Sequence, residues 1–121
     1  MKVVSYPTEE KVWGCVRHVF SSDQCAVSIL EVEKGSYCSK HYHRERVNRF
    51  IVQSGVIAVV WYPISGSVRR RRLKAGDVFD VPAGVIHRFE VIKSGVVVEV
   101  YFPSATVRQD DIVRLDLGGK L

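Results

Sequence analysis

Short β-forming segments, separated by turns that contain glycine, proline or serine, make up most of this sequence. Hardly any stretch shows the periodicity of an amphipathic helix, whereas short apolar runs and alternating patterns recur along the chain. The predicted strands are Cys15–Phe20, Ala26–Glu33, Ser39–His43, Arg49–Gln53, Val56–Tyr62, Val68–Leu73, Asp77–Val81, His87–Ile92 and Val96–Phe102. So many strands in a short chain predict an all-β fold, a compact sandwich or barrel that hides its strand edges.

The length and composition fit one globular domain. The chain has 121 residues, of which 46% are hydrophobic and 26% charged, so it can bury enough apolar surface to offset the entropy lost on folding. We expect one domain over residues 1–121 with a core at about 26–103, on which an N-terminal strand and a C-terminal tail pack. The longest uncharged apolar stretch, Val56–Ile64, is far shorter than the ~20 residues that span a bilayer, and the first residues lack a signal peptide's apolar region. We therefore expect a cytoplasmic protein without a membrane partner.

Three cysteines, Cys15, Cys25 and Cys38, stand at irregular spacing without a Cys-x2-Cys pair. An odd number without such a pair indicates neither a disulfide framework nor a zinc ribbon, so we expect free thiols. Cys38 lies three residues before His41 and could line the mouth of a site there, although on one unbroken strand it would point to the opposite face from His41. We interpret it as a small buried or rim residue.

The net charge of +5 owes much to the run Arg69–Arg72. The run follows the turn signal Ser65–Ser67 and precedes Leu73, which predicts a short exposed strand with at least two arginines facing solvent. Long basic side chains there would protect a sheet edge from pairing with another chain. Contact with nucleic-acid phosphates is the alternative, and we expect no nucleic-acid partner.

Histidines stand in two separated groups, His41-x-His43 and a single His87. Side chains at i and i+2 of a strand project from the same face, so the first group offers two imidazole ligands and a distant strand offers a third. This pattern predicts one divalent metal ion bound by all three. Zinc suits nitrogen ligands best, and manganese, iron, nickel or copper are alternatives. His18 lies outside both groups, and we interpret it as structural.

The two histidine groups lie in similar stretches, Gly35–Gly55 and Gly76–Gly95, each of which runs glycine, strand, histidine, apolar strand, glycine. On the strand that follows the first group, and on the strand that begins at His87, alternate residues share one face. The residues predicted to face inward together are Asn48, Phe50 and Val52 in the first stretch and His87, Phe89 and Val91 in the second. Two such halves would form a barrel with polar ligands at one level and apolar packing below them.

The motif Gly35-x5-His41-x-His43-x4-Asn48-x6-Gly55 resembles the first motif of the cupins, and Gly76-x5-Pro82-x-Gly84-x2-His87 resembles the second. The resemblance implies a double-stranded β-helix, or jelly-roll barrel, and a homodimer in which N-terminal strands pack across to the neighbour. The apolar stretch Val3–Tyr6 would suit such a strand. The family usually has a glutamate ligand where this chain has Asn48, and often an asparagine where it has Val91.

A narrower resemblance concerns the cupin-type mannose-6-phosphate isomerases. Val12-Trp13-Gly14 resembles their entry segment, Arg46-x-Asn48-x-Phe50-Ile51-Val52-x-Ser54-Gly55 the exit of their first motif, and Asp110–Leu115 their tail. This likeness implies a metal-dependent isomerase or epimerase whose small-molecule ligand is a sugar or sugar phosphate. Those isomerases usually have glutamine and glutamate where this chain has His41 and Asn48.

The residue at position 48 has a direct electrostatic consequence. Three neutral imidazoles and an amide oxygen leave the charge of a divalent ion uncompensated, whereas a glutamate would cancel part of it. The ion would then polarise a carbonyl or hydroxyl group strongly. Asn48 is therefore a candidate fourth ligand, and the alternative is that its amide hydrogen-bonds a ligating imidazole.

An aldose–ketose isomerisation needs a base that moves a proton between adjacent carbons. Glu99 is a candidate because it interrupts the apolar run Val96–Val100, where a buried carboxylate would have a raised pKa or need a partner. The alternative is that Glu99 faces outward on a half-exposed strand. Tyr101 is a second candidate, and Arg46 could receive a phosphate. Further possible proton carriers are Tyr37, Glu45 and Tyr62.

Three functions of different classes are compatible with these residues. The first is a metal-dependent sugar or sugar-phosphate isomerase or epimerase. The second is a metal-containing module that binds or senses a small molecule without turnover. The third is a three-histidine iron dioxygenase, because such a site leaves positions open for dioxygen and a bidentate substrate.

Overall fold

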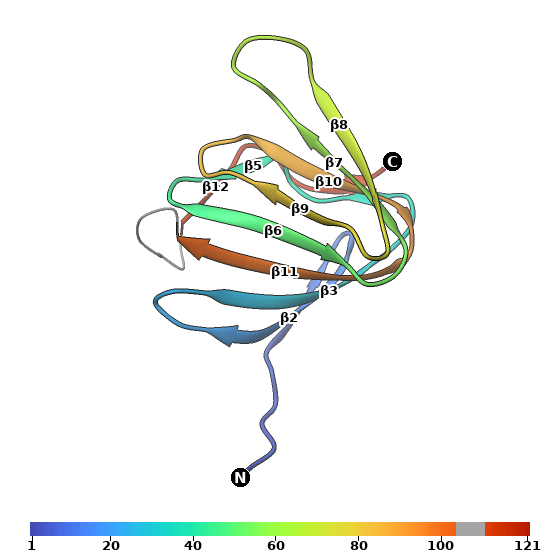
Figure 1. Ribbon diagram of the computed structural model, residues 1–121. Helices are drawn as coiled ribbons and strands as arrows, with labels where there is room; N and C mark the ends of the chain where they lie inside the picture. Colours follow the sequence, from blue (N-terminus) through green and yellow to red (C-terminus); the bar gives the residue numbers. More distant parts are fainter. Residues whose placement is uncertain (104–110) are drawn as a thin grey trace.

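The computed structural model describes residues 1–103 and 111–121, and these form two antiparallel sheets (Figure 1). One sheet has six strands in the spatial order β1-β2-β3-β11-β6-β9. Its strands are β1 (Thr8–Lys11), β2 (Gly14–Ser21), β3 (Ala26–Val32), β6 (Arg46–Val52), β9 (Val78–Val81) and β11 (Gly95–Pro103). Within the described residues no helix could cross a membrane. The all-β, jelly-roll fold class predicted from the sequence is confirmed.

The second sheet holds the order β12-β5-β10-β4-β13, and a branch in which β7 pairs with β10 and β8 pairs with β7. Its strands are β4 (Ser36–Tyr37), β5 (His41–His43), β7 (Val56–Trp61), β8 (Arg69–Lys74), β10 (His87–Lys93), β12 (Ile112–Arg114) and β13 (Gly119–Lys120). The tail therefore adds two strands, β12 beside β5 and β13 beside β4. Both histidine-bearing strands, β5 and β10, lie next to each other in this sheet.

Several predicted strands have different bounds in the structure. The segment expected at Ser39–His43 is a strand only from His41, because the chain leaves the sheet after β4 and re-enters at β5. At the N-terminus the strand is Thr8–Lys11, which pairs with β2, rather than Val3–Tyr6. The apolar segment Val3–Tyr6, which we expect to pack across a homodimer, is exposed in the single chain, and its pairing stays a prediction.

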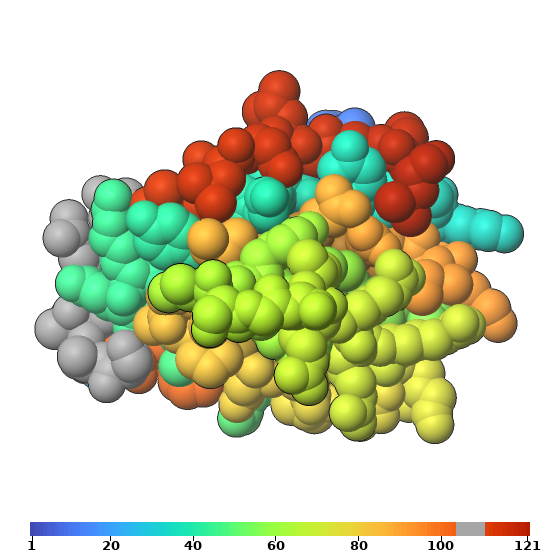
Figure 2. Space-filling model, turned by 90° about the horizontal axis from the view of Figure 1, so that it is seen from above, coloured from blue at the N-terminus to red at the C-terminus, as the bar shows by residue number. Residues whose placement is uncertain are grey.

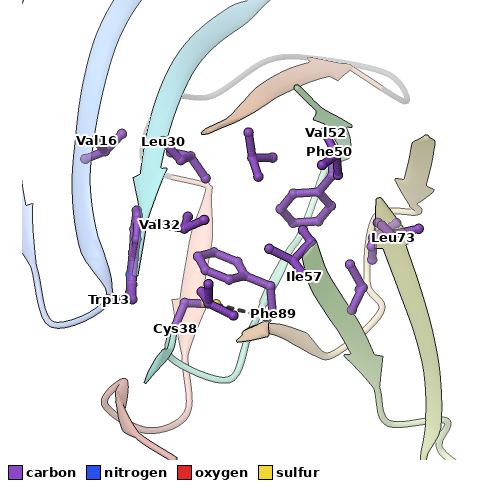
Figure 3. Close-up of a cluster of buried hydrophobic side chains, with 14 residues drawn as sticks. Trp13, Val16, Leu30, Val32, Cys38, Phe50, Val52, Ile57, Leu73 and Phe89 are labelled. Atoms are coloured by element: carbon purple, nitrogen blue, oxygen red, sulfur yellow. Dashed lines mark hydrogen bonds between the residues drawn. The ribbon is translucent and has the colours of Figure 1, made fainter. Parts of the chain in front are cut away.

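The hydrophobic core lies between the two sheets, where alternation along the strands turns every second side chain inward. Phe50, Val52, Phe89 and Val91 are at most 3% exposed, which confirms the inward faces predicted for β6 and β10. Phe89 meets Trp13 edge to face, with ring centroids 5.1 Å apart (Figure 3). Burial of side chains of this size stabilises the fold by about 1.5–3 kcal/mol each.

Glycine is needed where the two similar stretches end beside each other. Gly55 has a φ of 77°, a left-handed value that suits glycine. A Cβ atom added at Gly95 would lie 2.1 Å from the carbonyl oxygen of Ser54, so the two turns approach more closely than any side chain allows. These glycines let the β6–β7 and β10–β11 connections meet and so set the sheets face to face.

Candidate metal centre

Three histidines meet inside the barrel where β5 and β10 pair. His41 and His43 alternate on β5, and His87 begins β10 directly opposite His41. The ring centroid of His41 lies 4.4 Å from that of His87 and 5.0 Å from that of His43. All three residues are buried, and one ring nitrogen of each lies within 4.8 Å of the other two. The two separate histidine groups of the sequence therefore form one group that can hold a metal ion.

The protonation of each ring is set by a backbone carbonyl. Nδ1 of His41 lies 2.7 Å from the Ser39 oxygen, Nδ1 of His87 lies 2.9 Å from the Val85 oxygen, and Nδ1 of His43 lies 3.2 Å from a third carbonyl. A carbonyl only accepts, so each Nδ1 donates and each Nε2 keeps its lone pair. Nε2 of His41 and of His43 are buried and have no hydrogen-bond partner. A metal-binding histidine typically donates its other ring N–H, here Nδ1–H, to a backbone carbonyl or a carboxylate. The Nε2 atoms of His41 and His43, which have no partner, therefore fit a divalent ion.

Burial keeps all three imidazoles neutral. It lowers the pKa of His43 to about 2 and that of His87 to about 3, and nearby imidazoles act in the same direction. Burial also lowers the pKa of His41, against the effect of its hydrogen bond to the Ser39 carbonyl. At neutral pH the group therefore offers three unprotonated nitrogens, the form that a metal ion requires.

The side chain of Asn48 lies between His87 and Glu99. Its Nδ2 donates to Glu99 Oε2 at 3.2 Å, and its Oδ1 lies 3.1 Å from His87 Nε2. Asn48 Oδ1 and His87 Nε2 each carry a lone pair when the His87 proton is on Nδ1. Two such lone pairs repel each other unless a cation lies beside them. The structure thus places the Asn48 amide beside the three-histidine group, in contact with His87, and its role as a metal ligand stays a prediction.

Glu99 and Tyr101 lie beside this group. Glu99 is 8% exposed, so the alternative of an outward-facing carboxylate is wrong. The ring of Tyr101 has its centroid 4.9 Å from that of His43, and its hydroxyl hydrogen-bonds Glu99. Burial raises the pKa of Glu99, although the hydrogen bonds from Tyr101 and Asn48 oppose this shift. Burial and the neighbouring carboxyl raise the pKa of Tyr101 as well.

The guanidinium of Arg46 covers the ring of Tyr101 at 4.3 Å from its centroid. Arg46 is buried, and its Nε has no hydrogen-bond acceptor among the described residues. The nearest carboxylate oxygen, Oδ2 of Asp111, lies 3.9 Å from Nε, beyond hydrogen-bond reach. A buried guanidinium with unused donors is suited to an anion.

The family model described as "Cupin domain" matches residues 28–102. The chain belongs to the cupin family. A search of curated proteins found no significant match. Among solved structures, this cupin resembles the oxalate decarboxylase of Bacillus subtilis at pH 4.6, with a TM-score of 0.78, 16% identity, and coverage of 95% of this chain and 33% of that one.

The formate complex of Lactobacillus farciminis oxalate decarboxylase is also similar, with a TM-score of 0.76, 18% identity, and coverage of 91% of this cupin and 34% of that chain. A third structure, of the Bacillus subtilis enzyme described for its Mn(II) centres, has a TM-score of 0.73 and 17% identity, with coverage of 95% and 34%. This cupin thus spans about a third of the decarboxylase chains. Identities this low show a shared fold, and the narrower likeness to mannose-6-phosphate isomerases stays a prediction.

A cavity of about 350 Å³ opens from the metal-site end of the barrel. Its lining includes the candidate groups His41, His43, Arg46, Glu99 and Tyr101. The other proposed proton carriers do not line it. Tyr37 packs under Arg88 and Tyr62 under Lys40, and Glu45 contributes its backbone amide to Asp111. Tyrosines near a barrel rim thus serve packing here, and their proposed catalytic role is not supported by their positions.

Two residues interpreted as structural also line the cavity. Cys38 is buried with a free thiol that accepts a hydrogen bond from the Phe89 amide at 3.2 Å, and burial raises its pKa to about 12. It points inward, as His41 does, because the strand is broken between Tyr37 and His41. His18 lies at the mouth, where its Nε2 is 2.8 Å from Glu9.

Asp111 is the residue of the centre that the sequence reasoning missed. Its carboxylate accepts hydrogen bonds from the backbone amides of Arg44, Glu45 and Arg46 at 2.6 to 3.0 Å. Its backbone carbonyl accepts the Nδ1–H of His43. Asp111 lies within Asp110–Leu115, the tail that resembles the isomerases. Only the folded chain shows that Asp111 holds both the β5–β6 turn and a candidate metal ligand. Asp110 lies outside the described residues.

Replacing Asn48 with aspartate tests whether this side chain contacts the ion. An aspartate of the same shape would cancel part of the ion's charge, so we expect Asn48→Asp to bind zinc or manganese about tenfold more tightly. Without metal, the variant should melt at a lower temperature, because a second carboxylate would face Glu99. Competition with a chelator measures the affinity, and Gln53→Glu on the exposed surface is the control for net charge. Equal affinities in Asn48→Asp and the wild type would remove Asn48 from the ligand set.

Proposed function

We propose that this cupin is a metal-dependent isomerase or epimerase that moves a proton on a small sugar or sugar phosphate. The observation that carries the proposal is Glu99, a buried carboxyl with a raised pKa that is hydrogen-bonded to Asn48 beside the three-histidine group. A base for proton transfer works best when its pKa lies near the working pH, and burial moves a glutamate in that direction. Such a carboxyl next to a metal site is a candidate catalytic residue.

Each group at the cavity would have a separate role in the reaction. A divalent ion held by the three histidines would act as a Lewis acid toward carbonyl and hydroxyl oxygens. In an aldose–ketose isomerisation Glu99 would take the proton from C2, beside the carbonyl carbon, and return it to C1, while the proton of the C2 hydroxyl passes to the former carbonyl oxygen. Tyr101, whose raised pKa keeps its hydroxyl protonated, would donate a hydrogen bond to Glu99 and hold its carboxylate in place. The cavity of about 350 Å³ is large enough for one small substrate.

Arg46 supports an anionic substrate. Its guanidinium is buried at the cavity wall, is held against Tyr101, and has no acceptor for Nε. The phosphate of a sugar phosphate would accept those hydrogen bonds. The neutral donor set of three imidazoles and one amide leaves the metal site positively charged, which attracts the same kind of ligand.

Zinc is the metal that we propose first, because neutral imidazole nitrogens suit it. The Mn(II) centres described for the Bacillus subtilis oxalate decarboxylase make manganese the second candidate. Elemental analysis of the purified protein, followed by reloading with each metal, separates these two from iron, nickel and copper.

The non-catalytic module and the iron dioxygenase remain alternatives. Arg46, whose Nε has no hydrogen-bond acceptor among the described residues, and a positive metal site would bind an anion even if Glu99 moved no proton, which supports the module. Three neutral nitrogen donors also suit iron with open positions for dioxygen. The decarboxylases that share the fold act on oxalate by their names, so oxalate belongs among the anions to be tried. Oxygen uptake with iron-loaded protein would select the dioxygenase, and saturable binding without turnover would select the module.

Replacing Glu99 with glutamine tests the isomerase. In deuterated water, wild-type protein loaded with zinc or manganese should exchange the C2 proton of mannose 6-phosphate or a related sugar, as followed by NMR. We expect Glu99→Gln to slow this exchange at least about a hundredfold, because general-base catalysis contributes that much or more. Metal content should stay unchanged, and Glu31→Gln on the exposed face of β3 should exchange normally. Exchange at the wild-type rate in Glu99→Gln would show that another group is the base.

The homodimer implied by the family resemblance stays a prediction. The N-terminal segment supports it, because Val3 is 100% exposed and Val4 and Tyr6 are about half exposed in the single chain. Pairing across a dimer would cover this apolar segment. Sedimentation as a monomer at working concentrations would contradict the prediction.

A further inference from the structure

The most basic strand of the molecule, β8, forms an outer edge of the second sheet. Its four arginines, Arg69–Arg72, are exposed, and so is Lys74 at its end. The predicted exposed strand is therefore confirmed, with more than two arginines facing solvent. In Figure 2 the connection between β7 and β8 and β8 itself, coloured lime to yellow, cover much of the near face. This strand carries a charge close to the net charge of the whole chain.

Only part of this charge is compensated within the molecule. Arg70 pairs with the buried carboxylate of Glu90, and Arg69 lies over the ring of Trp61 at 5.9 Å from its centroid. Arg71 and Arg72 have no ion pair with a described residue. Side chains of neighbouring strand residues point to opposite faces, so positive charge flanks both sides of the strand.

Among the described residues, the outer side of the β8 backbone pairs with no strand, and only Lys74 at its end has partners there: its amide donates to the Asp77 carboxylate and its carbonyl accepts from the Asp77 amide. Within the described part of the chain β8 pairs with β7 alone, through a continuous register from Arg69 opposite Trp61 to Lys74 opposite Val56. Its outer amides and carbonyls therefore face away from any other strand, and Figure 1 shows β8 at the margin of the sheet. An edge of this kind can take up an extra strand.

We propose that β8 is a docking edge for an extended acidic segment of another polypeptide, which would add to the sheet as a strand. Backbone hydrogen bonds would hold the segment in place, and its acidic side chains on both faces would meet Arg71, Arg72 and their neighbours. A second copy of β8 is a poor occupant, because arginines would then face arginines. The same repulsion keeps this edge from self-association.

The chemistry of the edge favours a polypeptide over a nucleic acid. A strand edge presents amide donors and carbonyl acceptors in alternation. Another strand supplies a complement for both, whereas phosphate groups only accept and would leave the carbonyls unpaired. Arginines on both faces of the strand also suit a partner in the plane of the sheet better than a polyanion lying on one face.

The test uses a fluorescent peptide with a run of glutamates between valines, and the same peptide with alternate backbone amides N-methylated. We expect anisotropy to show saturable binding of the first peptide, and hydrogen exchange to show protection of the β8 amides. N-methylation should abolish binding, since it blocks strand pairing and keeps the charge. Arg71→Glu/Arg72→Glu should weaken binding at least about tenfold, whereas Lys2→Glu/Lys34→Glu, with the same change in net charge at other exposed sites, should not.

Equal binding of the N-methylated peptide, or of single-stranded DNA, would overturn the proposal in favour of simple attraction between charges. Equal weakening by the control pair of substitutions would do the same. Absence of peptide binding would leave edge protection as the role of these arginines. Because the N-methylated peptide is tested on the wild-type protein, the result does not depend on how well the variants fold.

Discussion

The metal-free protein should lose stability steeply below about pH 6.5. Burial lowers the pKa of His43 to about 2 and of His87 to about 3, against 6.5 for an ordinary histidine. Below pH 6.5 the unfolded chain binds protons on these residues and the folded chain does not, so acid favours unfolding. Each such histidine lowers the free energy of unfolding by about 1.4 kcal/mol per pH unit, so these two together give about 3 kcal/mol per unit. His41 acts in the same direction.

The buried Glu99 works against this trend. Its pKa is raised in the folded state, so as the pH falls the folded protein takes up a proton there before the unfolded chain does. Through this one residue, acid therefore increases the free energy of unfolding. One carboxyl cannot offset three histidines, and the net effect of acid remains destabilising down to about pH 4.

Urea unfolding of the metal-free protein between pH 7 and pH 4 measures this slope. Added zinc or manganese should increase the stability near neutral pH, by about 2.7 kcal/mol when the free metal is a hundred times its dissociation constant. The metal effect should fade in acid, because protons compete for the same nitrogens. His18→Gln is the control, since His18 is exposed and outside the three-histidine group. A stability that is flat between pH 7 and pH 5 without metal would show that the imidazoles are not buried together.

Local patterns in the sequence were enough to predict the fold class and most of the strands. Alternation identified the inward faces of β6 and β10, because a strand buried on one side must place apolar residues at every second position. The histidine spacing then put His41, His43 and His87 in one group, since the two strands that carry them are neighbours. The inward faces follow from short stretches of chain, whereas the meeting of His87 with His41 depends on the pairing of β5 with β10, which the resemblance to the two cupin motifs implied.

Features that depend on distant contacts were missed or wrong. The break before His41 turns Cys38 inward, and it arises because β4 and β5 meet different parts of β10. Nothing in the residues around Ser39 signals it. The pairing of β12 with β5 likewise joins segments that are far apart in sequence. The role of Asp111 depends on three backbone amides whose convergence exists only after folding, so no side-chain pattern could reveal it.

Asp111→Ala should damage both the fold and the metal site. The substitution leaves the amides of Arg44, Glu45 and Arg46 without their acceptor, and it removes the nearest carboxylate from the guanidinium of Arg46. Loss of one partner from a buried, charge-assisted network costs about 3–5 kcal/mol. Urea unfolding should show a decrease in this range, whereas Asp116→Asn, on the exposed part of the same tail, should change stability much less.

The effect on metal binding separates positioning from simple loss of stability. The Asp111 carbonyl that orients His43 remains in the alanine variant, but its position depends on the carboxylate bonds that hold this segment against the β5–β6 turn. We expect the metal affinity of the folded fraction to fall about 10- to 100-fold, as when other groups that orient metal ligands are removed. Electron paramagnetic resonance of copper-loaded protein should show altered nitrogen coupling in the variant. If affinity and spectrum match the wild type while stability falls, Asp111 holds only the turn, and His43 is oriented by the rest of the barrel.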